Sequence, residues 1–512
     1  MNYLIGVDIG TQGTKTTMRD ETGNIAGEAF IPSRLLYPNE GAIIQDPEEM
    51  LASVVDTINS VISHSKVDPR DVKALGICGQ MAGIIGVDRS GSAVTPYDSW
   101  LDTRCGKYRE LFISAGETDV IKLTGCPVTF AHGPKILWWK HEHPDVYKKI
   151  HSFVQPSSYC IMRLCGLDGR DAFIDHTYLH FSGFGDNNRQ CWSEELLGAL
   201  DVAKEKMPRI MKSFDIAGYL TKEMSASCGL AEGTPVVAGC GDTAASSFGA
   251  GVIRSGLLFD VAGTASVLAC ATNHYSPDVH HKTIMYAPSV IEGLYTPMAY
   301  ISGGGMCLKW MRDDVLGKNM SYEDLDALAY EVPPGSGGLL FIPHFSGRTC
   351  PNDEFVRGSY INLTWKHNVA HMYRAIMEGI AYEYGIYADI IKELVPSIKM
   401  QSVISVGGGS RSKLFAQIKS DVLGIPVYTY GTSDTASLGC CAIAGYGIGL
   451  YNSVSELIEK TTNLHMTAEP DMKRNEYYMH PKNMYTKAIN SLRGVYEEAI
   501  AINSCRPWKH YP

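Results

Sequence analysis

Apolar and polar residues follow a regular pattern from the start of the chain. Short, largely apolar runs bounded by turn residues predict strands. They are residues 3–9, 15–19, 25–31, 73–78 and 84–87. Residues 46–63 carry apolar side chains at helical spacing, and Asp46 and Pro47 suit an N-cap and a first helical position. Strands that alternate with helices predict an α/β architecture.

The pattern restarts near residue 230. Residues 236–239 and 257–262 predict strands, with a helix of small residues between them that ends near residue 249. Later helices are predicted at 156–165, 306–312, 369–393, 413–423, 434–444 and about 482–500 by their apolar spacing. The segments VDIGTQGTK and VAGTASVL both read as strand, Gly-Thr turn and strand. This repeat indicates an internal duplication, with one phosphate-binding turn in each of two related lobes.

Composition narrows the class of protein. The chain has 512 residues, of which 45% are hydrophobic and 20% charged, so we expect two or more globular domains. A net charge of −10 argues against a nucleic-acid partner, which usually needs a basic surface. We see neither a secretory signal nor an apolar run long enough for a membrane span. The 14 cysteines include no CxxC pair, so we expect reduced thiols, no structural zinc site and a cytoplasmic protein.

Two turns carry groups that suit phosphate and Mg²⁺. Asp8 ends the first strand, where a carboxylate is well placed to hold Mg²⁺ directly or through water. The following Gly/Thr turn offers backbone N–H groups to phosphate, although an ordinary β-hairpin explains the same residues. Residues 407–410 join a strand to a helix N-terminus, which suits a nucleotide or a simple tight connection. The chain has neither GxGxxG at this turn nor a P-loop motif.

Other residues suggest a reaction at a hydroxyl group. Asp242 begins a helix, where it serves either as an N-cap or as the general base that accepts a proton from an attacking hydroxyl. Asp102 and Arg104 form either a surface ion pair or, beside Trp100, the wall of a sugar pocket. Gln80 adds an amide that both donates and accepts hydrogen bonds.

With these residues in hand, the chain resembles the FGGY family of carbohydrate kinases, nearest to its xylulokinase-like branch. The resemblance covers roughly residues 3–450. The matching blocks are VDIGTQGTK, ICGQMAG, SWLDTRC, FAHGPKILWW, AGCGDTAASSFGAG, DVAGTAS, ISGGG, GRTCP, RAIMEGIAY and VGGGSRSKLFAQIKSDVLGIPV. The resemblance implies the two-lobed fold of sugar kinases, actin and heat-shock ATPases, with duplicated ribonuclease-H-like lobes and a central cleft. We expect an N-terminal, sugar-binding lobe over residues 1–250 and a C-terminal, nucleotide-binding lobe over residues 251–512.

The resemblance also implies roles for individual residues. Asp8 positions Mg²⁺, and Asp242 is the catalytic base. The residues implied to bind ATP are Thr11, Gln12, Gly13, Lys15, Thr264, Gly305, Gly408, Gly409 and Ser412. The residues implied to bind the sugar are Gln80, Met81, Trp100, Asp102, Arg104 and Phe130.

One departure affects the expected substrate. Xylulokinases usually have GQMHG where this chain has GQMAG, and Ala82 supplies no polar side chain to a sugar. This departure counts against xylulose itself. We expect a ketopentose such as xylulose or ribulose, with a polyol or sugar acid (glycerol, erythritol or gluconate) as the alternative. A nucleotide-gated ATPase without kinase activity is a second alternative. The tail after residue 465 either caps the second lobe or makes a homodimer contact.

Overall fold

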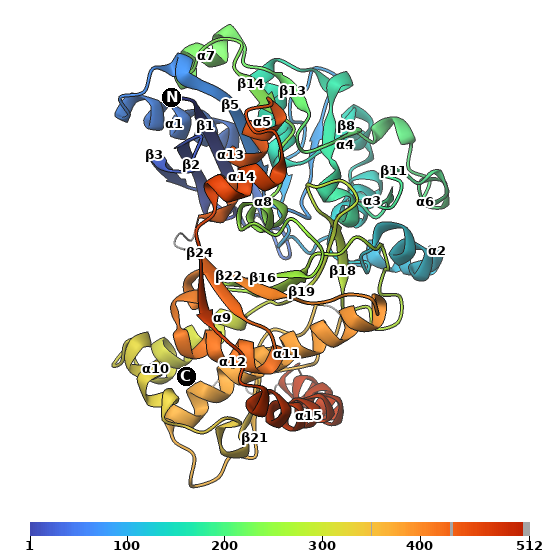
Figure 1. Cartoon of the computed structure of the whole chain (residues 1–512). Helices are drawn as coiled ribbons and strands as arrows, with labels where there is room; N and C mark the ends of the chain where they lie inside the picture. The colour runs from blue at the N-terminus through green and yellow to red at the C-terminus, as the bar shows by residue number, and fades with distance from the viewer. Residues whose placement is uncertain (350, 431–433, 505–512) are drawn as a thin grey trace.

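The computed structural model describes residues 1–349, 351–430 and 434–504, and over these residues the chain forms two α/β lobes (Figure 1). Cys350 of the GRTCP block and the end of the tail lie outside the described residues. The first lobe is built around a seven-stranded sheet. Its strands, in spatial order, are β13 (Ile216–Tyr219), β14 (Pro235–Val237), β5 (Val72–Gly79), β1 (Tyr3–Ile9), β2 (Gly13–Asp20) and β3 (Ile25–Pro32), and β15 (Cys240–Gly241) also pairs with β5.

The second lobe repeats this topology, and this confirms the predicted duplication. Its strands, in spatial order, are β18 (Met285–Pro288), β19 (Tyr295–Ile301), β17 (Ser266–Cys270), β16 (Leu257–Ala262), β22 (Ser402–Val406), β23 (Val427–Tyr430) and β24 (Leu464–Ala468). In each lobe an antiparallel hairpin, β1–β2 or β16–β17, leads the sheet. The first strand of that hairpin then pairs in parallel with a later strand, β5 or β22. The two Gly-Thr turns therefore occupy equivalent positions.

Helix α13 (Thr435–Gly447) lies late in the sequence but packs on the first lobe, against β1, β5 and helix α8 (Asp242–Gly249). Glycines allow this close approach. A Cβ atom added to Gly6 would lie 2.1 Å from the Ser437 carbonyl oxygen, and one added to Gly76 would lie 2.3 Å from that of Cys440. The small residues of α13 thus pack closely against the sheet. The division of the chain into two lobes at residue 250 stays a prediction. Helix α13 lies after residue 250 in the sequence but packs on the first lobe.

The other face of the first sheet is covered by helices α1 (Pro47–His64) and α5 (Pro156–Cys165). The sequence predicted both helices. It did not predict α2 (Gly106–Thr124) or α3 (His132–Glu142). Gly116, at φ 124°, interrupts α2 and weakens its helical pattern. Further short elements of this lobe are β4 (Ile44–Gln45), β6 (Ile85–Val87), β7 (Tyr97–Asp98), α4 (Pro144–Lys149), β8 (Ser152–Val154), β9 (Phe173–Asp175), β10 (Gly185–Asp186), β11 (Cys191–Trp192), α6 (Glu194–Ala199), β12 (Arg209–Met211) and α7 (Lys222–Cys228).

Helices cover the outer face of the second sheet, away from the first lobe (Figure 1). They include α9 (Gly304–Trp310), α10 (Tyr322–Tyr330), α11 (Val369–Leu394), α12 (Lys413–Leu423) and α15 (Met472–Ser504). The second lobe also contains β20 (Leu340–Ile342) and β21 (Ser359–Ile361), whereas α14 (Val454–Thr461) packs with α13 on the first lobe. Helix α15 begins ten residues before the predicted 482 and continues through Pro481. Tyr478 and Tyr485, on either side of this proline, are buried against α11, so tertiary packing outweighs the proline.

The two lobes are joined by contacts of β18 with the first lobe. The Tyr286 backbone N–H donates to the Gly125 carbonyl oxygen at 2.7 Å, and His176 Nε2 lies 2.8 Å from the Ser289 carbonyl oxygen. Over the described residues, no helix is both long enough and apolar enough to cross a membrane. No disulfide joins the cysteines of the described ranges.

Candidate active site

Asp8 and Asp242 meet at one edge of the first sheet. In the parallel pairing of β1 with β5, Asp8 is the partner of Cys78, and Cys78 is in turn the partner of Cys240 on β15. Asp242 follows two residues after Cys240, at the start of α8. Because the carboxyl ends of parallel strands share one sheet edge, both carboxylates reach the same place. Both residues are partly exposed there.

The carboxyl groups of Asp8 and Asp242 both have raised pKa values. Burial, and then the negative charges of Asp242 and Asp434, raise the pKa of Asp8 to about 7. Burial raises the pKa of Asp242 to about 6, although hydrogen bonds from the backbone and hydroxyl of Thr243 lower it. The Thr243 N–H donates to Asp242 Oδ1 at 2.6 Å. Asp242 is not the N-cap of α8, because that position is held by Gly241.

Asp434 brings a third carboxylate and a cation to this region. Lys15 Nζ lies 3.1 Å from Asp434 Oδ2 and 3.4 Å from Glu28 Oε2. Burial lowers the pKa of Lys15, but the charges of Asp434 and Glu28 outweigh it and the net pKa is raised. The ammonium group predicted to lie near ATP is therefore paired with carboxylates in this structure.

Excess negative charge at this edge suits a divalent cation. The negative charges of Asp242 and Asp434 raise the pKa of Asp8, and the positive charge of Lys15 lowers it. The described residues provide no preformed group of three metal-ligating side chains. Mg²⁺ needs no such group, because it usually keeps several waters and binds one or two carboxylates together with substrate phosphates. The residues present therefore fit Mg²⁺.

The predicted nucleotide residues of the second lobe come together around one cavity of about 530 Å³. Its walls include Thr264, Gly305, Gly408, Gly409 and Ser412, all of which the sequence singled out. Ser412 also caps α12 through a hydrogen bond from the Phe415 N–H at 3.0 Å. A cavity of this size is within the range of small-ligand sites.

Glycine is required where α9 approaches the second Gly-Thr turn. A Cβ atom added to Gly305 would lie 1.9 Å from the Gly263 carbonyl oxygen, and one added to Gly304 would lie 2.1 Å from Ser266 Oγ. The Met306 N–H donates to the Thr264 carbonyl oxygen at 3.1 Å. This contact fixes the turn against the start of α9 and so shapes one wall of the cavity.

The sequence analysis gave no binding role to several cavity residues, although Met377 and Arg411 lie in its matching blocks. They are Lys309, Tyr322, Asp326, Tyr373, Met377 and Arg411. Most lie on the amphipathic helices α9, α10 and α11, where periodicity marks a buried face but no local motif marks a binding residue. Arg411, next to the Gly407–Ser410 turn, is the one that proximity to a motif could have identified.

The first Gly-Thr turn is hydrogen-bonded to the predicted sugar residues. Thr11 Oγ1 donates to Gln80 Oε1 at 3.2 Å and accepts from the Trp100 indole N–H at 2.9 Å. Trp100 is 45% exposed, so its ring face is open while its N–H is occupied. Gln12 lies exposed at the tip of this turn, and Gly13 is buried beneath the ring of Phe30. The Thr11 hydroxyl, predicted to meet ATP, is hydrogen-bonded in this structure to two of the residues predicted to bind the sugar.

Asp102 and Arg104 form a buried cluster rather than a surface ion pair. Arg104 Nε donates to Asp102 Oδ2 at 2.8 Å, and Arg104 Nη2 donates to Asp98 Oδ1 at 2.6 Å. The Arg104 guanidinium also lies 4.1 Å from the ring centre of Trp138. Burial raises the pKa of Asp98 to about 6, against the lowering effect of Arg104. The carboxylate of Asp102 is 1% exposed, so its present partners belong to the protein.

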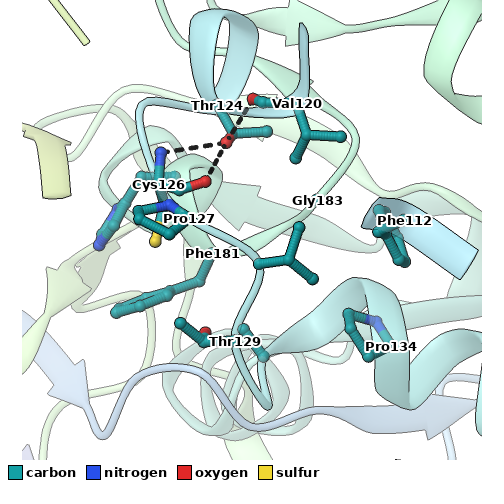
Figure 2. Close-up of a pocket in the computed structure, with 12 residues that line it drawn as sticks. Phe112, Val120, Thr124, Cys126, Pro127, Thr129, Pro134, Phe181 and Gly183 are labelled. Carbon is teal, nitrogen blue, oxygen red and sulfur yellow. Dashed lines mark hydrogen bonds between the residues drawn. The ribbon is translucent and has the colours of Figure 1, made fainter. Parts of the chain in front are cut away.

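Phe130 lies on the segment between α2 and α3. The Arg109 guanidinium lies 4.6 Å from its ring centre, and Lys135 Nζ donates to its carbonyl oxygen and to that of Asp102. Figure 2 shows the cavity beside this segment, with Thr124 bonded to Val120 and Cys126. Its volume of about 10 Å³ admits one water and no sugar. Phe130 therefore stays a prediction as a sugar contact.

Met81 and Ala82 follow Gln80 at the end of β5. Met81 is buried, and its side chain leaves no room for a Cβ atom on Gly241, which would lie 2.5 Å away. Ala82 has φ 60°, a left-handed conformation that disfavours residues with a Cβ atom. Such strain is found most often at functional sites.

The comparisons with known proteins agree with this geometry. Residues 3–249 match the N-terminal domain of the FGGY family of carbohydrate kinases, and residues 259–448 match its C-terminal domain. A xylulose kinase from Bacillus subtilis (strain 168) is 28% identical over 473 residues, which cover 90% of this chain and 91% of that relative. A gluconokinase from the same organism is 25% identical and covers 90% and 91% of the two chains.

A solved structure shows the same fold. The ligand-bound xylulose kinase from Lactobacillus acidophilus superposes with a TM-score of 0.89 at 23% identity, over 97% of this chain and 100% of that one. This likeness confirms the two-lobed architecture predicted from the sequence.

Proposed function

Since the chain belongs to the FGGY family of carbohydrate kinases, we propose that its sugar is a ketopentose such as xylulose or ribulose. Family membership makes the protein a phosphotransferase that takes phosphate from ATP and transfers it to an alcohol group of a sugar. The choice of a ketopentose is supported by the relative named xylulose kinase, which aligns over nine-tenths of both chains.

The position of Asp242 carries the proposed chemistry. It lies at the sheet edge that also holds Asp8, and its pKa of about 6 leaves it mostly ionised at neutral pH. A base with a pKa close to the working pH is effective in proton transfer. Asp242 takes the proton from the sugar hydroxyl as that oxygen attacks the γ-phosphate of ATP in line.

The remaining residues bind and orient the substrates. The cavity of the second lobe holds the nucleotide, with Thr264 and the glycines at 305, 408 and 409 beside its phosphates. The first turn, Thr11 to Gly13, approaches the phosphates from the other lobe with backbone N–H groups. The open face of Trp100 and the amide of Gln80 contact the sugar.

Asp8 would hold Mg²⁺ at this site. When bound, the ion neutralises the charge that develops on the phosphates. Lys15, tied to Asp434, stays close to the same region and contributes positive charge. Closure of the two lobes would exclude water and so limit hydrolysis of ATP.

A substrate panel tests the proposed sugar. Purified protein with MgATP is assayed for ADP release in the presence of pentuloses, polyols and aldonic acids. We expect the highest kcat/KM with a pentulose. A higher kcat/KM with gluconate would instead favour the sugar-acid alternative, which the relative named gluconokinase and the apolar Ala82 support.

A further inference from the structure

A chain of hydrogen bonds runs from the first phosphate turn to a buried residue that no motif marks, Gln45. The Trp100 N–H donates to Thr11, the Thr11 hydroxyl donates to Gln80 Oε1, and Gln80 Nε2 donates to Gln45 Oε1 at 2.7 Å. Gln45 is 2% exposed and Gln80 is 1% exposed, so water does not compete for this last bond. Four separate segments of the sequence thus meet in one directed chain.

The hydrogen bonds of this structure give the Gln80 amide one orientation. Thr11 accepts from Trp100 and donates to Gln80 Oε1, so Gln80 presents its carbonyl oxygen to Thr11. The NH₂ end of Gln80 then points away, and the carbonyl oxygen of Gln45 is the acceptor that receives it. If residue 45 offered no acceptor, the Gln80 amide could rotate by half a turn without losing a hydrogen bond to residue 45.

The backbone holds Gln45 rigidly in place. It ends β4, where it is the partner of Tyr97 on β7, and the next residue, Asp46, is the N-cap of α1. The Ile43 N–H, just before β4, donates to Asp102 Oδ2 at 3.0 Å. Gln45 is therefore fixed to the same segment, residues 97–104, that carries Trp100.

We propose that Gln45 is a positioning residue for sugar recognition, which fixes the Gln80 amide with its carbonyl oxygen toward Thr11 and the substrate. It acts through Gln80 and does not itself contact the sugar. The oriented amide selects a sugar that offers a hydroxyl donor at this point. This inference rests on the proposed function, in which Gln80 binds the sugar.

Two substitutions of Gln45 distinguish the effect of its hydrogen-bond acceptor from the effect of its side-chain size. Gln45→Met keeps the size of the side chain but removes the acceptor, so the amide of Gln80 loses its orientation and one buried hydrogen bond. We expect kcat/KM for the preferred sugar to fall about 10- to 100-fold, through a higher sugar KM and with KM for ATP unchanged. Gln45→Glu keeps an acceptor for the Gln80 NH₂ group, and we expect it to stay within about threefold of wild type.

A control variant removes a similar amide elsewhere in the first lobe. Gln155→Met replaces a glutamine that is also 1% exposed, but whose Oε1 has no hydrogen-bond partner among the described residues. It should leave the sugar KM unchanged. The proposal is overturned if Gln45→Met leaves the sugar KM unchanged, if Gln45→Glu is as impaired as Gln45→Met, or if KM for ATP rises equally.

A measurement without substrate tests the hydrogen-bond chain directly. The protein has seven tryptophans, and in a ¹⁵N-tryptophan NMR spectrum Trp100→Phe identifies the indole signal of Trp100. Gln45→Met should shift that signal and speed its hydrogen exchange, whereas Gln155→Met should not. An unchanged Trp100 signal overturns the proposal. If wild type phosphorylates no sugar, the proposed function fails, and this spectrum still decides whether Gln45 orients Gln80 and Thr11.

Discussion

Asp8 and Asp242 lie close enough that the negative charge of Asp242 raises the pKa of Asp8, second only to the effect of burial. The strand register explains this proximity, because β1, β5 and β15 run in parallel and end at one edge. A carboxylate for Mg²⁺ and a carboxylate for the sugar proton can therefore act on one phosphate transfer. The predictions below test this arrangement and the parts of the fold that support it.

Replacement of the proposed base should remove most turnover. Asp242→Asn keeps the shape of the side chain but cannot take a proton, and general-base catalysis typically contributes about 10²–10⁴-fold. We expect kcat to fall by that factor while the affinity for ADP, measured by calorimetry, persists, because the nucleotide cavity lies in the other lobe. Asp56→Asn, an exposed change on α1, is the control. Near-normal turnover in Asp242→Asn would exclude Asp242 as the base.

The pH profile should show two acidic groups. Asp8 has a pKa of about 7 and Asp242 has a pKa of about 6. Both groups act in the ionised form. We therefore expect kcat/KM to fall as the pH decreases below 7 and to fall more steeply below 6. More Mg²⁺ should shift only the upper part to lower pH, because a bound cation favours the ionised form of Asp8. A single decline beginning near pH 4, the ordinary range of aspartate, would contradict both assignments.

The contact of Gly305 with the second turn should be needed for nucleotide binding. Gly305→Ala places a Cβ atom 1.9 Å from the Gly263 carbonyl oxygen, so backbone must move and the wall of the cavity changes. We expect the affinity for ADP to fall at least about tenfold and stability to decrease by about 1–3 kcal/mol. Gly494→Ala, in an exposed part of α15 with nothing within 4 Å of the new atom, should be neutral or slightly stabilising. Unchanged ADP affinity in Gly305→Ala would be inconsistent with this site.

Glu383 should anchor the core of the second lobe. Its carboxylate is fully buried and accepts hydrogen bonds from Arg348 at 2.7 Å, Tyr485 at 2.8 Å and His344 at 3.2 Å. Burial would raise the pKa of Glu383, but the charges of Arg348 and His344 outweigh it and hold the pKa far below its ordinary value. Glu383→Gln leaves the Arg348 charge unpaired in the interior, and we expect a loss of about 3–5 kcal/mol in urea unfolding at pH 7.

The same ion pair predicts how this loss depends on pH. A carboxyl group whose pKa is lowered by folding stabilises the protein fully above its unfolded pKa, about 4.3, and progressively less below it. The difference in stability between wild type and Glu383→Gln should therefore be constant near neutrality and shrink as the pH falls below about 4. A difference that grows in acid would contradict the assigned role of Glu383.

The sequence identified those parts of the site that are formed by residues adjacent in the chain. A Gly-Thr turn, a strand that ends in aspartate and a glycine-rich helix start are local features, so Asp8, Thr264 and Gly408 could be found from spacing. Ser412 was implied by the family resemblance. It missed Asp326 and Tyr373 in the nucleotide cavity, because a residue on an amphipathic helix shows only that its face is buried.

By itself, then, the sequence determined the class of fold, the repeat of two lobes and the turns that suit phosphate, because hydrophobic periodicity and turn chemistry are properties of short segments. Only the tertiary structure decided that α13 returns to the first lobe, that Asp434 pairs with Lys15, and that Gln45 orients Gln80. These contacts join residues far apart in the chain. They depend on how sheets and helices pack, which no local pattern records.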